Sequence, residues 1–115
     1  MIVGAAVVEL HVHGSQSLKQ KRGVVRSIVQ RVRNHFNVSV AEIGGHDTWQ
    51  RVVLGFAATG NDHRYVRGLL DRALVFVEDL HLAEVTGSDV ELLEMCYEGA
   101  ASEADSDSES EPEDA

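Results

Sequence analysis

The order of two hydrophobic periodicities constrains the fold of this chain more than any other feature. Residues 2–13 alternate apolar side chains with a period of two, as a strand with one buried face does. Residues 18–36 place apolar side chains at helical spacing, and residues 66–80 repeat that spacing later in the chain. Three further segments read as strands: 37–43, 49–59 and 83–95. Thr-Gly-Ser at 86–88 is expected to interrupt the last of them.

This order is β-α-β-β-α-β, the ferredoxin-like arrangement of the α+β class. Right-handed crossovers place both helices on one face of a four-stranded antiparallel sheet and leave the other face open. Ser17 and Gln20 form a capping-box pattern at the start of the first helix. Asn61 or Asp62 is expected to cap the second. In the first strand, the side chains expected to share one face are Ile2, Ala6, Val8, Leu10 and Val12.

The charges divide the chain into one domain, residues 1–98, and an acidic tail, residues 99–115. The tail has seven acids, no base and no apolar residue larger than alanine, so we expect it to be disordered. Cys96 is the only cysteine, which excludes an intrachain disulfide. No apolar run is long enough for a membrane span, and the first ten residues lack a basic leader. We therefore expect a cytoplasmic protein without a membrane partner.

Residues 10–41 carry six Lys and Arg residues and no acid. On a helical wheel, four of them fall within about 60° of one another and form a stripe beside the apolar face. These four are Lys19, Arg22, Arg26 and Arg33, while Lys21 and Arg31 point elsewhere. The stripe either matches an external anion or pairs with acids on neighbouring elements. The candidate internal partners are Glu42, Asp71 and Glu78.

The topology brings the end of the first strand, the start of the first helix and the loop before the third strand to one edge of the sheet. Trp49 and Arg51 lie in that region, and there they are candidate base or sugar contacts for unpaired RNA. The alternative is that Trp49 is a packing residue or a dimer contact.

Glu9, His11 and His13 alternate along the first strand, so their side chains share the open face. Imidazoles two residues apart on a strand can chelate Zn²⁺, and His46 or Asp47 could complete such a site. The spacing is generic, however, and we expect solvated side chains with no metal and no cofactor. No catalytic motif is present, so we do not expect an enzyme.

Four segments appear in the order and spacing of a known family: SLKQKR, NVSVAEIG, WQRVVLG and ND. With them the chain resembles the YlxP-like family of small bacterial domains over nearly all of residues 1–95. The resemblance implies a small cytoplasmic ferredoxin-like domain. It also implies a ribosomal or RNA-linked role, because genes of this family commonly lie beside those for translation initiation and ribosome maturation factors.

The sequence therefore predicts a non-enzymatic accessory protein that associates with RNA or a ribosomal subunit. The predicted RNA contacts are Lys19, Lys21, Arg22, Arg26, Arg33, Trp49 and Arg51. The alternative is a dimeric protein-interaction or small-ligand module with no nucleic-acid role. A homodimer is expected to use the open sheet face, which should carry Val3, Ala5, Val7, Val53 and Ala57.

Overall fold

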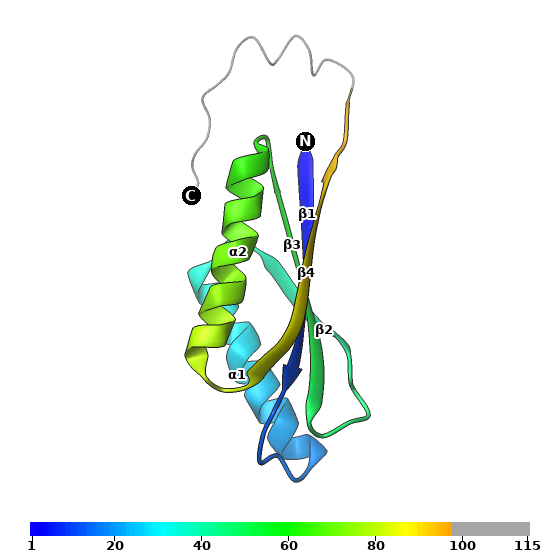
Figure 1. Ribbon diagram of the computed structural model, residues 1–115, viewed down its shortest axis with the longest axis vertical. Helices are drawn as coiled ribbons and strands as arrows, with labels where there is room; N and C mark the ends of the chain where they lie inside the picture. The colour runs from blue at the N-terminus through cyan, green and yellow to red at the C-terminus, as the bar shows by residue number, and fades with distance from the viewer. Residues whose placement is uncertain (98–115) are drawn as a thin grey trace.

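The computed structural model describes residues 1–97 and has the β-α-β-β-α-β order predicted from the sequence (Figure 1). Its elements are β1 (Ile2–His11), α1 (Leu18–His35), β2 (Ser39–Gly44), β3 (Arg51–Gly60), α2 (His63–Leu80) and β4 (Glu84–Glu94). The predicted tail, residues 99–115, lies outside the described residues.

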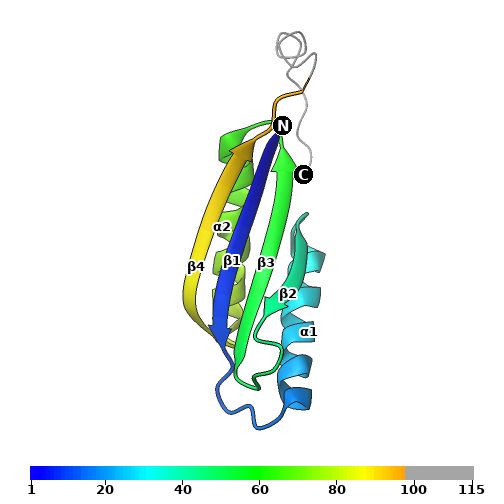
Figure 2. The ribbon, with the colours of Figure 1, turned by 90° about the vertical axis from the view of Figure 1, so that its right-hand side faces the viewer.

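The four strands form one antiparallel sheet in the order β2-β3-β1-β4. Both helices cover the same face of it, α2 over the central strands and α1 beside β2 (Figure 2). The predicted ferredoxin-like α+β fold is therefore confirmed. Neither α1 nor α2, the two helices of residues 1–97, combines the length and hydrophobicity of a transmembrane helix.

The alternation predicted for β1 determines which side chains enter the core. Ile2, Ala6, Val8 and Leu10 are buried on the helix side of the sheet, and Val12 continues the series beyond the strand. Gly4 holds the remaining place in this row because α2 lies too close for a side chain. A Cβ atom there would stand 2.6 Å from a methyl carbon of Val66.

The two helices begin with the caps that the sequence indicates. Ser17 Oγ accepts a hydrogen bond from the Gln20 backbone N–H, and Gln20 Oε1 in turn accepts from the Gln16 N–H. Asp62, rather than Asn61, caps α2 by accepting from the Tyr65 N–H. Each cap satisfies a helix donor that has no intrahelical partner.

The last strand differs from the prediction. Residues 86–88 do not interrupt β4, because the extra residue is absorbed by a bulge opposite Glu9 and Leu10. Thr86 is the residue left out of the register, and its hydroxyl donates to the main-chain carbonyl of Glu9. A β-bulge lets the ladder continue on both sides of one unpaired residue.

Candidate nucleic-acid interface

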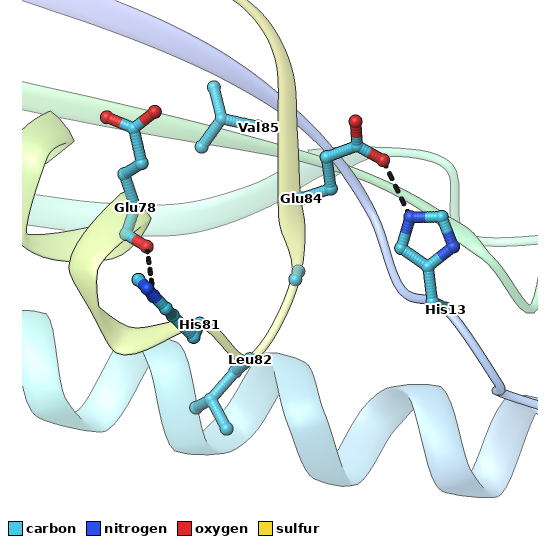
Figure 3. A pocket seen from close by; sticks show the side chains of 7 residues that line it. His13, Glu78, His81, Leu82, Glu84 and Val85 are labelled. Atoms are coloured by element: carbon cyan, nitrogen blue, oxygen red, sulfur yellow. Dashed lines mark hydrogen bonds and ion pairs between the residues drawn. The ribbon is translucent and has the colours of Figure 1, made fainter.

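His11 at the end of β1 and His13 just beyond it lie close together, and His13 contacts β4. Their ring centroids are 4.3 Å apart, and His13 Nε2 lies 2.6 Å from a carboxylate oxygen of Glu84. His13 and Glu84 border an open hollow of about 540 Å³, where His81 Nδ1 donates to the main-chain carbonyl of Glu78 (Figure 3). Within residues 1–97, no three His, Cys, Asp or Glu side chains are grouped so that they could hold a metal ion.

The loop after β1 and the loop before β3 are joined by hydrogen bonds at one end of the sheet. The Val12 N–H donates to the Gln50 carbonyl at 2.7 Å, and the Gln50 side chain donates to the Ser15 carbonyl at 3.3 Å. The first turn of α1 follows directly from Ser17, so it lies at the same end (Figure 1).

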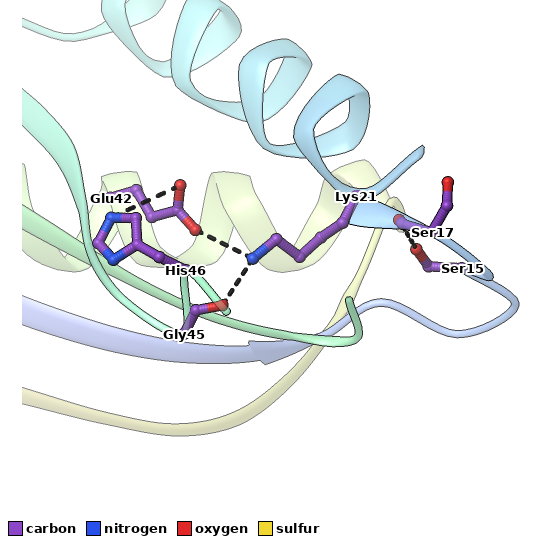
Figure 4. A network of polar contacts seen from close by, with 6 residues as sticks. All are labelled: Ser15, Ser17, Lys21, Glu42, Gly45 and His46. Carbon is purple, nitrogen blue, oxygen red and sulfur yellow. Dashed lines mark hydrogen bonds and ion pairs between the residues drawn. The ribbon is translucent and has the colours of Figure 1, made fainter. Parts of the chain in front are cut away.

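Lys21 is the residue for which the structure corrects the sequence-based hypothesis. Its side chain is 1% exposed, and its ammonium donates to the Gly45 carbonyl at 2.6 Å and to Glu42 Oε2 at 3.3 Å (Figure 4). An ammonium enclosed in this way cannot reach a phosphate. Lys21 is thus a structural residue that holds α1 to the loop between β2 and β3.

The position of Lys21 relative to the apolar residues of α1 indicates that its side chain is buried. The buried positions of α1 are 21, 25, 28 and 32, which follow one another at the four-, three- and four-residue intervals of a helix face. Lys21 therefore begins the apolar face of the helix. Its place there requires a partner for the charge, and Glu42 supplies one.

The Lys and Arg residues of α1 other than Lys21 are exposed to solvent, and among residues 1–97 only Arg33 of these has a partner for its side chain. The side chains of Lys19, Arg22 and Arg26 make no hydrogen bond or ion pair with any group of residues 1–97. The expected internal pairing with Glu42, Asp71 or Glu78 is therefore absent for these three residues, and α1 has no acid in its first turn. We call these three residues the basic face of α1.

A shallow hollow lies on the solvent side of α1 beside the basic face. It has a volume of about 460 Å³ and is lined by Gly23, Arg26, Ser27, Gln30 and Arg31. Gly23 contributes to it because a Cβ atom at that position would meet nothing within 4 Å. Arg31 was not among the predicted contacts, and the structure brings it to the same hollow as Arg26.

The two remaining predicted arginines already have partners inside the molecule. Arg33 donates from Nη2 to the Val40 carbonyl on β2 at 3.0 Å, and Arg51 pairs with Glu9 across β1 and β3. Because the Glu9 carboxylate neutralises the guanidinium that it pairs with, Arg51 adds little net positive potential to this end of the sheet.

Trp49 lies in the loop before β3 and is 50% exposed. No aromatic contact of its ring occurs among residues 1–97. A half-exposed indole at the end of the sheet where α1 begins offers an apolar plane to a partner.

Comparison with known proteins gives a family match and distant fold matches. The model of the family "Protein of unknown function (DUF503)" matches residues 3–90. "Uncharacterized protein YlxP" of Bacillus subtilis (strain 168) is 40% identical over 85 residues, which cover 74% of this chain and 92% of that protein.

Solved structures resemble the chain more weakly. "Structural Genomics, protein YJCS" has a TM-score of 0.49 at 9% identity and covers 77% of this chain and 96% of that one. A mutant of SnoaB, a cofactor-independent oxygenase from Streptomyces nogalater, has a TM-score of 0.46 at 15% identity. It covers 81% of this chain and 92% of that one.

Proposed function

The chain belongs to the DUF503 family, and we propose that it is a non-enzymatic accessory protein that binds RNA, with ribosomal RNA as the expected target. Lys19, Arg22 and Arg26 of the basic face are the phosphate contacts in this proposal. The observation that carries it is the exposure of these three side chains without a carboxylate partner within residues 1–97.

The position of the basic face within the helix supports an external anion. The first turn of an α-helix carries a partial positive charge, which disfavours a cation there by about 0.3–1 kcal/mol. Lys19 lies in that turn with no acid to offset it, and Arg22 follows in the next turn. Bound phosphates would supply the missing negative charge, and from residue 19 to 26 the three cations span about 10 Å of helix.

Trp49 adds a second kind of contact at the same end of the molecule. Bases of single-stranded RNA stack on aromatic side chains, while phosphates are bound by Lys and Arg. A strand lying along α1 would bring a base toward the indole. The proposal therefore combines phosphate contacts on α1 with one stacking position.

The decisive experiment is cosedimentation of the full chain with purified ribosomal subunits between 50 and 200 mM salt, a range over which phosphate contacts weaken. The test variant is Lys19→Glu/Arg22→Glu/Arg26→Glu. A matched control is Arg64→Glu/Arg67→Glu/Arg72→Glu, which makes the same change in net charge on exposed residues of α2.

We expect the wild type and the α2 variant to sediment with the subunits and the folded α1 variant to remain in the supernatant. Equal loss of binding in both variants would show that the basic face is not the site. Failure of the wild type to bind at 50 mM salt would overturn the proposal and favour a protein-interaction or small-ligand module.

A further inference from the structure

The face of the sheet opposite the helices is apolar across its centre. The side chains that point to it from β1, β3 and β2 include Val3, Ala5, Val7, Val53, Ala57, Ala41 and Ile43. Val7 and Ile43 are 41% and 53% exposed, and Ile43 lies against Gly55 in the middle of the face. The charged residues lie toward the ends of the strands and along β4.

The size of this face suits a second sheet. Ten residues of β1 and four strands give a rectangle of roughly 19 by 33 Å, or about 600 Å² on each copy. Two such faces would bury about 1,200 Å² together, which is the lower end of the range for specific interfaces. The small side chains at the centre allow the close approach that sheet-on-sheet packing requires.

The charges on β4 determine which two-fold arrangement is favourable. Asp89 and Glu91 stand on the open face, opposite Val7 and Ala5, and neither forms an ion pair with a residue in the described part of the chain. A two-fold axis across the strands would place β4 over the partner's β4 and oppose these acids. An axis along the strands places β4 over the partner's β2, where no acid points to the open face.

The same axis places an exposed leucine over a hollow. Leu93 is 64% exposed on β4, at the level of Val3 and Thr59. A hollow of about 440 Å³ lies at that level on the other edge of the sheet, where β2 begins. It is lined by Asn37, Val38, Ser39, Ala57, Ala58 and Thr59.

We propose that two copies of this chain pack through their open sheet faces about an axis along the strands, each Leu93 entering the partner's hollow beside β2. Two apolar faces that lie open in the single chain are removed from water by this contact. The inference does not depend on RNA binding, because it uses the side of the sheet that the helices do not cover.

Sedimentation equilibrium of the full chain at tens of micromolar tests the proposal. We expect a dimer for the wild type and a rise in the dissociation constant on the order of 100-fold for Val7→Asp, which buries an unpaired charge. The control is Val75→Asp, the same substitution at an exposed valine of α2, which should leave the dimer unchanged. A monomeric wild type, or a Val7→Asp variant that stays dimeric, overturns the proposal.

Leu93→Ala provides a second variant that removes only an exposed side chain and so preserves the fold. We expect it to weaken the dimer on the order of tenfold. An unchanged dissociation constant would contradict the placement of Leu93 in the partner's hollow.

The direction of the axis is tested with a short bifunctional maleimide in a Cys96→Ser background. Ala41→Cys and Asp89→Cys lie on opposite edge strands of one copy and come together only between copies. We expect the double variant to form covalent dimers and neither single variant to do so. Dimers of Asp89→Cys alone would overturn the axis along the strands.

Discussion

The ammonium of Lys21 donates to the carbonyl oxygen of Gly45 at a distance of 2.6 Å, although 24 residues separate the two in sequence. This bond joins the second turn of α1 to the loop between β2 and β3, and Glu42 completes it with a carboxylate. The first turns of the helix are thereby fixed relative to the sheet edge, and the basic face keeps its orientation toward solvent.

Removing the Lys21 ammonium should destabilise the protein without touching an exposed site. We expect Lys21→Ala to lower the free energy of unfolding by about 2–4 kcal/mol, because Glu42 would keep a largely buried charge without its partner. Urea denaturation followed by circular dichroism measures this change. Lys19→Ala, at an exposed position of the same helix, should stay within about 0.5 kcal/mol of the wild type.

Two glycines with the same backbone conformation should respond differently to alanine. Gly14 and Gly45 both have φ of +79°, but only at Gly45 would a Cβ atom meet the Arg51 carbonyl oxygen, at 2.4 Å. We expect Gly14→Ala to lower the free energy of unfolding by about 1 kcal/mol, because alanine is strained in the left-handed conformation. Gly45→Ala should lower the free energy of unfolding clearly more than Gly14→Ala in the same denaturation experiment. Equal losses in the two variants would contradict the close contact between a Cβ atom at position 45 and the Arg51 carbonyl oxygen.

The salt dependence of RNA binding should report how many cations of the basic face contact phosphates. Three phosphate contacts predict that log affinity falls with log salt at a slope of about −2 to −3, depending on whether the RNA is single- or double-stranded. Neutralising Arg22 or Arg26 to Gln should reduce the size of that slope by about 0.7–0.9 each. Fluorescence anisotropy of a labelled oligonucleotide between 50 and 200 mM salt measures it.

A lysine outside the basic face serves as the control for this measurement. A folded Lys21→Met variant should keep the wild-type slope, because the Lys21 ammonium that it lacks is buried in the wild type and makes no phosphate contact. A reduced slope for this variant would show that Lys21 reaches the RNA after all.

Replacement of Trp49 should weaken RNA binding through a contact that carries no charge. We expect Trp49→Ala to lower the affinity about tenfold while the salt slope stays the same, since stacking is worth about 1–3 kcal/mol per base. Trp49 is the only tryptophan, so quenching of its emission during an RNA titration reports the contact in the wild type. Unchanged emission on a saturated complex would contradict a stacking role.

Periodicity and capping residues predicted the fold well because these signals are local. The alternation along β1 and the helical spacing of both helices depend on neighbours within a few residues, and the structure has each element close to its predicted range. The burial of Lys21 could not be predicted from local signals, because it depends on Glu42 and Gly45, more than twenty residues away in the sequence. The Arg51 pair with Glu9 and the continuation of β4 through its bulge also required knowledge of the strand register.

Both helices lie on one side of the sheet, so the molecule has two unlike sides. In a dimer built through the sheets, the helices form the two outer layers, and the two copies of α1 lie on the order of 30 Å apart. Their cations then face outward in opposite directions, which prevents them from closing around a single strand. If the basic face binds RNA as proposed, such a dimer would gain avidity by bridging separate stretches of one folded RNA.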